Sequence, residues 1–157
     1  MHGDTTRPHR RHRNDRGLQR LRRFLRRYGA LHDLVDDTAQ ICVAALPIGV
    51  TPLVRIAGHQ FDGAARLLDA GALGIICPNV STRAEAFVRA CRFPPLGERS
   101  VAGAGPLQGY RQIPLGEVNK QGNTATSLIA MLETPEGIAN ADTGAALPGI
   151  DVLLIGS

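Results

Sequence analysis

The sequence of 157 residues contains no tryptophan, and aromatic residues make up only 4% of it. A core must therefore be built from aliphatic side chains, which are available because 43% of the residues are hydrophobic. No run approaches the roughly 18 apolar residues that a membrane-spanning helix needs. The N-terminal region has no apolar segment either, so a secretory signal peptide is not expected. Length and composition together suit one domain with a modest core.

Cysteine is also scarce, and the three that occur do not form a pattern. Cys42, Cys77 and Cys91 are odd in number, widely spaced and set among apolar neighbours. This distribution indicates buried free thiols in a reducing compartment, and not a disulfide framework or a zinc site. We therefore expect a cytoplasmic protein, in which Cys77 belongs to the core and does not act as a nucleophile.

The net charge of +4 is unevenly distributed along the chain. Residues 1–30 hold ten arginines against Asp4 and Asp15, a net charge of +8, whereas the remaining residues carry −4. We predict a basic, Arg-rich leader over residues 1–31, poorly ordered or forming a short helix near 18–28, and a globular domain over residues 32–157. Arginine-rich arms are typical of nucleic-acid binding. That function remains open as an alternative, although nothing downstream matches a binding module.

From Asp33 onward, helical patterns alternate with short apolar segments. We expect helices from 33 to just before Pro47 or Gly49, and over 59–72, 81–93 and 134–147. We expect strands over 51–56, 74–80, 127–133 and 150–157, and a long Gly- and Pro-rich connection over 94–124. Strands that are apolar throughout are typical of parallel sheets covered on both faces. The sequence therefore predicts an α/β fold that supplies about half of a (β/α)₈, or TIM, barrel.

Parallel α/β folds place their functional sites at the carboxyl ends of the strands. That rule selects Arg55 and Glu133, together with Gly156 and Ser157, and it also selects Pro78 and Asn79 at the end of the second strand. An arginine between two apolar residues is costly to bury without an anion, and its guanidinium is suited to bind a carboxylate. Glu133 follows an apolar strand and offers hard oxygen ligands for a divalent ion. The alternative is an internal salt bridge between Arg55 and Glu133 across the strand ends.

An ordered series of phrases resembles the HpcH/HpaI aldolase/citrate lyase family from about Asp36 to Ser157. The phrases are PLVRI, LLDAGA, GIICPNVSTRAEA, CRFPPLGERS, MLETPEGIANAD and PGIDVLLIGS. The resemblance implies a barrel of metal-dependent carbon–carbon lyases, among which pyruvate aldolases cleave 4-hydroxy-2-oxo acids to pyruvate and an aldehyde. It further implies Mg²⁺, Mn²⁺ or Co²⁺ as cofactor, a 2-oxo acid and an aldehyde as small-molecule partners, and a homo-oligomer.

The resemblance also implies roles for individual residues. Arg55 matches the catalytic arginine that contacts the keto acid and stabilises its enolate, and Glu133 matches a metal carboxylate. Gly156 and Ser157 match the substrate-binding start of a Gly-x-x-Asp-Leu phrase, whose second metal carboxylate would fall beyond Ser157. Met131 stands where pyruvate aldolases often have glutamine, a difference that bears on the subfamily.

One element of the family pattern is not matched upstream. The family has an Asp-x-Glu-His phrase whose histidine is the general base, and the spacing places that histidine at Ala30; His32 is the nearest candidate. Codons read one base out of frame from Arg26 are compatible with Val-Asp-Met-Glu-His, with the histidine codon on Ala30. This suggests the hypothesis that residues 1 to about 31 are out of frame, which the nucleotide sequence tests. A non-catalytic remnant, or a partner subunit that completes a barrel, remains an alternative.

Overall fold

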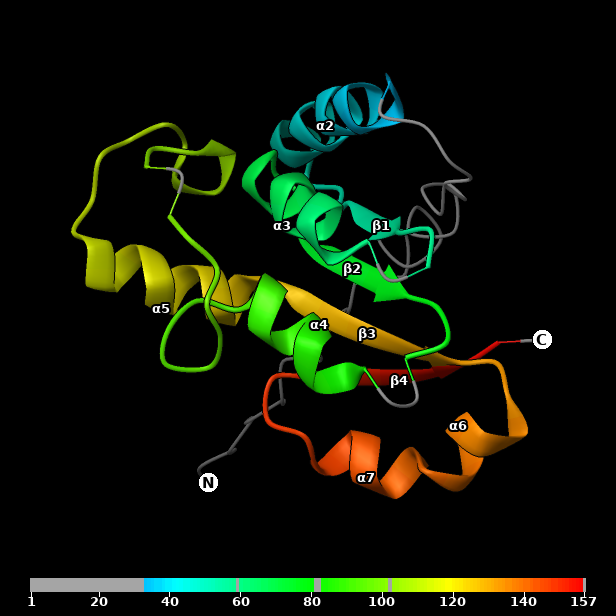
Figure 1. The fold of residues 1–157 in the computed structure, drawn as a ribbon. Helices are drawn as coiled ribbons and strands as arrows, with labels where there is room; N and C mark the ends of the chain where they lie inside the picture. The colour runs from blue at the N-terminus through cyan, green and yellow to red at the C-terminus, as the bar shows by residue number, and fades with distance from the viewer. Residues whose placement is uncertain (1–32, 59, 81–82, 102, 157) are drawn as a thin grey trace, which may run out of the picture.

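The computed structural model describes residues 33–58, 60–80, 83–101 and 103–156. Within these residues, four strands form one sheet: β1 (Leu53–Arg55), β2 (Gly74–Cys77), β3 (Ser127–Leu132) and β4 (Val152–Ile155). The sheet order is β1-β2-β3-β4, and every neighbouring pair is parallel (Figure 1). This confirms the predicted α/β class, with parallel strands alternating with helices. The predicted basic leader, residues 1–31, lies outside the described residues.

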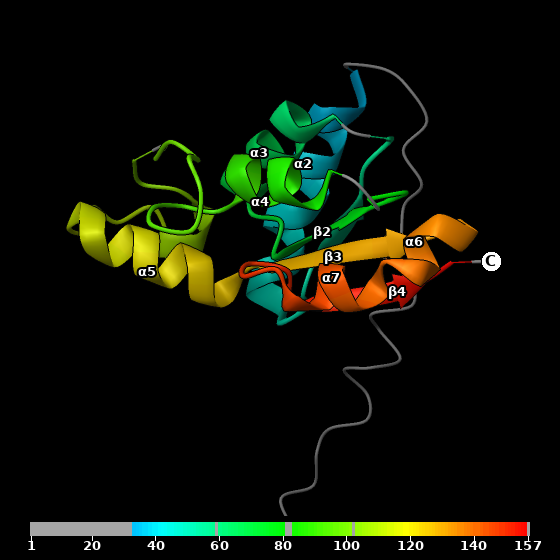
Figure 2. The same ribbon diagram turned by 60° about the horizontal axis from the view of Figure 1, so that its bottom comes forward.

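Three helices cover one face of this sheet. They are α2 (Asp33–Ala45), α3 (Phe61–Asp69) and α4 (Ala84–Cys91). Helix α2 packs on α3, α3 packs on α4, and all three lie on the same side of the strands (Figure 2). Two shorter helices, α6 (Pro135–Ala139) and α7 (Ala141–Ala146), connect β3 to β4, and α7 contacts β4. In the described part of the chain, no helix is long and apolar enough to cross a membrane.

The core lies between the sheet and these helices. Alternate strand residues that point toward the helices are fully buried, including Ile75, Cys77 and Leu128 at 0% exposure. They pack with aliphatic and aromatic residues of α3 and α4, such as Leu67 and Phe87. All four residues of β2 are buried, which explains why its sequence is apolar without alternation.

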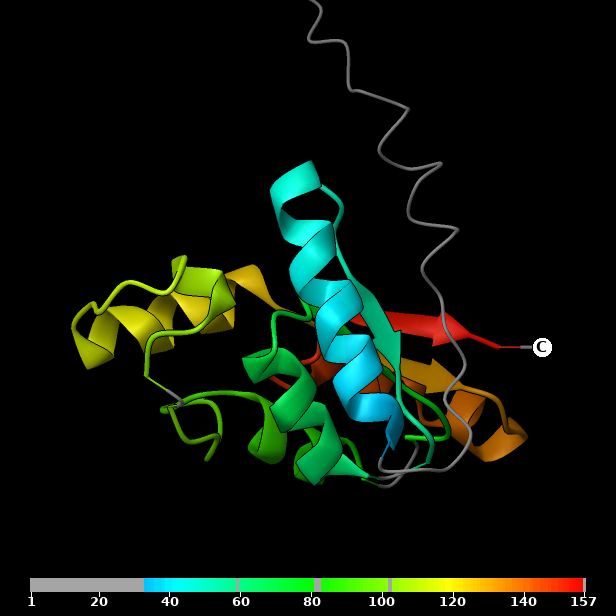
Figure 3. The same cartoon turned by 90° about the horizontal axis from the view of Figure 1, so that it is seen from above.

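The prediction of a connection over 94–124 was wrong in its last third. The structure forms a 3₁₀ turn, η2 (Pro106–Gln108), and then a helix, α5 (Leu115–Ala125), which projects beyond the amino ends of the strands (Figure 3). Gly122 looks like a helix breaker in the sequence, but it makes room for Phe93, whose Cε2 would lie 2.4 Å from an added Cβ. The predicted helix over 134–147 is likewise two helices, α6 and α7, which meet at Asn140.

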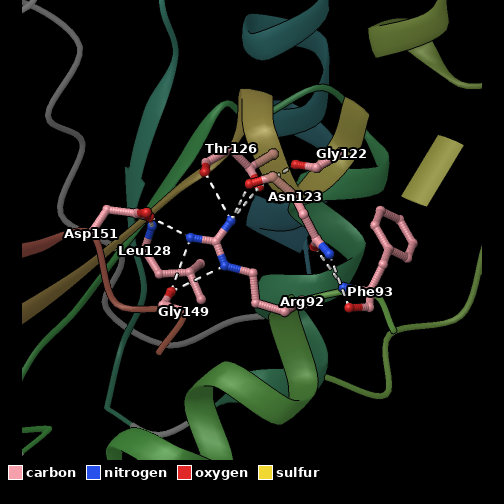
Figure 4. A network of polar contacts seen from close by, with 8 residues as sticks. All are labelled: Arg92, Phe93, Gly122, Asn123, Thr126, Leu128, Gly149 and Asp151. Carbon is pink, nitrogen blue, oxygen red and sulfur yellow. Dashed lines mark hydrogen bonds and ion pairs between the residues drawn. The ribbon is translucent and has the colours of Figure 1, made fainter. Parts of the chain in front are cut away.

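Arg92 joins the amino ends of β3 and β4 at the side opposite the strands' carboxyl ends. It is only 1% exposed and donates hydrogen bonds to four residues: the carbonyls of Asn123, Thr126 and Gly149 and the carboxylate of Asp151 (Figure 4). Asp151 also accepts a 2.7 Å hydrogen bond from the Leu128 N–H of β3. Because Asp151 directly precedes β4, the network helps to fix the register of the two strands.

A second arginine orders the segment that follows α4. Arg99 lies over the Phe93 ring, with its guanidinium carbon 4.3 Å from the ring centroid. It also donates to the Asp69 carboxylate at the end of α3, at 2.6 Å from Nη2. Arg92, Phe93 and Arg99 all belong to the phrase CRFPPLGERS, so these three residues of the phrase have packing roles in the structure.

Candidate functional site

Arg55 and Glu133 meet at the carboxyl ends of β1 and β3. Arg55 is the last residue of β1, and Glu133 directly follows β3. The Arg55 Nη2 lies 3.5 Å from the Glu133 Oε1, and the two side chains are 19% and 26% exposed. Because β2 lies between the two strands, the long arginine side chain must cross it to reach the carboxylate. The salt bridge across the strand ends, which the sequence offered as the alternative to a functional pair, is therefore present.

The strands and the following helix fix the backbone on both sides of this pair. Beyond Arg55, the Ile56 N–H donates to the Ile76 carbonyl at 3.0 Å, which extends the pairing of β1 with β2. Beyond Glu133, the Thr134 hydroxyl accepts a 3.0 Å hydrogen bond from the Gly137 N–H and caps α6. Because the strand end and the helix cap hold the backbone on both sides, Glu133 can move mainly by rotation of its side chain.

Gly156 lies beside Glu133 at the same edge of the sheet. The Gly156 N–H donates to the Leu132 carbonyl at 3.0 Å, which continues the pairing of β4 with β3 beyond Ile155. The register pairs Met131 with Leu154, so alternation along the strands places Met131, Glu133 and Gly156 on one face. The structure thus brings Arg55, Glu133 and Gly156 to one edge, whereas Ser157 lies outside the described residues.

At the carboxyl ends of the strands, the Glu133 carboxylate is suited to bind a hard divalent ion as its one protein ligand. The described residues contain no cluster of three or more His, Cys, Asp or Glu side chains suited to a metal. Mg²⁺ and similar ions, however, often bind one or two carboxylates and complete their coordination with water and substrate oxygens. The partly exposed Glu133 carboxylate meets that requirement as one ligand. Ala30 and His32, the positions considered for a general base, lie outside the described residues.

Two further residues at this edge had weak signals in the sequence. Asn79 follows β2 and adopts a left-handed backbone conformation with a φ of 51°, which asparagine tolerates better than most residues. Met131 was singled out only through the family resemblance, and the strand register places it on the face that carries Glu133. Its apolar side chain therefore lies on the same face as the Glu133 carboxylate.

Cys77 is a core residue and not a nucleophile. Its side chain is 0% exposed, and its Sγ lies 3.7 Å from the carbonyl oxygens of Gly58 and Pro78. Burial raises the pKa of the Cys77 thiol to about 12, although the positive charge of Arg55 acts to lower it. Cys42 and Cys91 are also buried, with pKa values raised by burial to about 11 and about 12. This confirms the prediction of buried free thiols.

These pKa values predict low thiol reactivity in the folded chain. At pH 8, well below the raised pKa values, Cys42, Cys77 and Cys91 stay protonated, and the nucleophilic thiolate is rare. We expect an aromatic disulfide reagent to label none of the three thiols rapidly in native buffer and all three in denaturant. The absorbance of the released thiolate measures both. Rapid native labelling of Cys77 would contradict its placement in the core.

Comparison with known proteins gives a consistent result. A sequence model of the HpcH/HpaI aldolase/citrate lyase family matches residues 27–157. A 4-hydroxy-4-methyl-2-oxoglutarate aldolase from Chaetomium globosum is 41% identical over 124 residues, which are 76% of this chain and 46% of the relative. A hydroxypyruvate/pyruvate aldolase from Rhizorhabdus wittichii is 39% identical over 80% of this chain and 50% of the relative.

A solved structure supports the barrel assignment. The crystal structure of an HpcH/HpaI aldolase from Desulfitobacterium hafniense superposes with a TM-score of 0.73 at 27% identity, over 84% of this chain and 51% of that protein. The chain therefore spans about half the length of the relatives that it matches, and its sheet corresponds to part of their fold.

Proposed function

Because the chain belongs to the HpcH/HpaI aldolase/citrate lyase family, we propose that it serves metal-assisted aldol or retro-aldol chemistry that links a 4-hydroxy-2-oxo acid to pyruvate and an aldehyde. The observation that carries this proposal is the Arg55–Glu133 pair at the carboxyl ends of β1 and β3. Relatives whose names describe aldolases for 4-hydroxy-4-methyl-2-oxoglutarate and for pyruvate support this substrate class. HpcH/HpaI aldolases generally depend on a divalent metal, which suits a carboxylate at this position.

In this proposal the two side chains have different tasks. The Glu133 carboxylate would hold Mg²⁺, Mn²⁺ or Co²⁺, and the bound ion would supply Lewis-acid stabilisation of negative charge on the 2-oxo acid. Arg55 would exchange its contact with Glu133 for the substrate, because the guanidinium fork matches a carboxylate or an enolate oxygen. The backbone at Gly156 and Ser157 would line the substrate next to Glu133.

An assay of pyruvate release tests the proposal on the full chain. We expect cleavage of 4-hydroxy-4-methyl-2-oxoglutarate in the presence of added Mn²⁺, and loss of that cleavage when EDTA removes the metal. Lactate dehydrogenase and NADH report the pyruvate continuously. No pyruvate above the protein-free control would favour the alternative of a non-catalytic remnant or partner subunit. Release that persists in EDTA would contradict the role of the metal.

Two broader assignments follow from other features. We propose the cytoplasm as the compartment, because all three cysteines are buried free thiols and a reducing environment preserves that state. We also propose a homo-oligomer, as the resemblance to the family implies.

The division into a leader over residues 1–31 and a barrel domain over residues 32–157 remains a prediction, as does nucleic-acid binding by the leader. Both depend on residues 1–31, which lie outside the described part of the chain.

A further inference from the structure

We propose that Gly156 is a positioning residue, because its lack of a side chain leaves the space in which the Glu133 side chain reaches toward Arg55. The proposal has two halves. The steric half, that Gly156 leaves room for the Glu133 side chain, rests on the geometry alone. The functional half, that this room allows Glu133 to bind the metal, deepens the proposed function and rests on Glu133 as the metal carboxylate. The backbone conformation does not require glycine at this position, because the Gly156 φ lies outside the left-handed region.

The distances around Gly156 define the requirement as one of space. A Cβ added at this position would lie 2.8 Å from the Glu133 Cγ and 3.3 Å from its Oε1. It would also lie 3.3 Å from the Met131 Cγ. Carbon–carbon contacts are optimal at about 3.5 to 4.0 Å, so the first of these contacts is repulsive. Any side chain at position 156 therefore competes with Glu133 for the same volume.

The backbone offers no simple way to relieve this contact. The Gly156 N–H donates to the Leu132 carbonyl at 3.0 Å, next to Glu133, and holds the two chain segments together. Thr134 is fixed on the other side by its cap on α6. The Glu133 side chain must therefore rotate about its Cα–Cβ bond, because its Cγ is the atom in closest contact. Such a rotation moves the carboxylate away from its position 3.5 Å from Arg55.

Gly144 of α7 provides a matched control for the Gly156→Ala substitution. A Cβ added at Gly144 would have the Leu153 Cδ2 as its nearest neighbour, at 3.7 Å, which is an ordinary contact. Alanine is also favoured over glycine within a helix. Gly144→Ala therefore makes the same chemical change close to β4 without crowding Glu133.

The first measurement is Mn²⁺ binding, followed by electron paramagnetic resonance of the free ion. We expect Gly156→Ala to weaken binding by about 10- to 100-fold, the range found when residues that orient metal ligands are altered. Gly144→Ala should bind as the unmodified chain does. Equal Mn²⁺ affinity in Gly156→Ala and the unmodified chain would overturn the functional half of the proposal.

The second measurement is a double-mutant cycle on stability, which needs no metal. Glu133→Ala removes the Cγ, so Gly156→Ala should lower the urea midpoint in the native background and leave it nearly unchanged in the Glu133→Ala background. If Gly156→Ala prevents folding by itself, folding of the double variant supports the proposal. Equal destabilisation in both backgrounds, or unfolding in both, overturns it.

The two measurements separate the two proposals. If the unmodified chain does not bind Mn²⁺, the proposed function fails at Glu133. The stability cycle then still decides whether Gly156 makes room for that side chain.

Discussion

Arg92→Met is expected to lower the free energy of unfolding by about 3 to 5 kcal/mol, a large share of the 5 to 15 kcal/mol typical of a domain. Methionine fills much of the same volume but donates no hydrogen bond. The substitution would leave the carbonyls of Asn123, Thr126 and Gly149 without the donor that they now share. Urea unfolding followed by circular dichroism measures the loss.

Arg89→Met is the matched control, because it makes the same change one turn earlier, in α4. Arg89 pairs with Glu98, but these two side chains are 65% and 69% exposed, so water replaces the contact readily. We expect little change in the urea midpoint for this variant. Arg92→Lys should fall between the two, since lysine keeps the charge but cannot reach all the acceptors of the guanidinium fork. Equal midpoints for the two methionine variants would contradict the role assigned to Arg92.

The sequence predicted the strands well, because a buried parallel strand has a simple signature. Residues 74–77 are apolar or small throughout, because the strand is covered on both faces, and their sequence is a continuous apolar run and not an alternating pattern. Helix α5 lacks such a signature, since Gly116 and Gly122 lower its helix propensity and few of its side chains are buried. Its Gly122 is explained only by the Phe93 ring, which comes from a distant part of the chain. Tertiary packing of this kind cannot be deduced from local pattern.

The part of the candidate site that lies at the ends of the strands could be predicted from the sequence. Arg55 and Glu133 both end apolar strands, and parallel strands bring their carboxyl ends to one edge, so their meeting followed from topology. The close approach of Gly156 to Glu133 did not follow, because it depends on the register of β4 against β3 and on one rotamer. Arg92 did carry a signal, since it stands between Cys91 and Phe93, and an arginine among apolar residues needs partners when buried.

Arg55→Met is expected to lower kcat/KM for pyruvate release by about 10²- to 10³-fold, the usual effect of removing one group that stabilises developing negative charge. Its effect on the metal should have the opposite sign. The guanidinium lies 3.5 Å from the Glu133 carboxylate, and its positive charge opposes the approach of a divalent cation. Mn²⁺ affinity should therefore stay constant or rise. Initial rates and free Mn²⁺, measured on the same preparation, test the two signs together.

Glu133→Gln is the variant with which the rate and Mn²⁺ affinity of Arg55→Met should be compared. Glutamine keeps the shape and can still accept a hydrogen bond from Arg55, but it is a poorer ligand for a hard cation, so Mn²⁺ affinity should fall together with kcat/KM. If the pair served only to join β1 and β3, both variants would lose similar stability and neither would alter Mn²⁺ binding. A partly exposed pair at 3.5 Å contributes about 1 kcal/mol or less to stability, so both variants should remain folded. Opposite changes in metal affinity between two folded variants would assign the carboxylate to the metal and the guanidinium to the substrate, because a salt bridge alone predicts the same change in both.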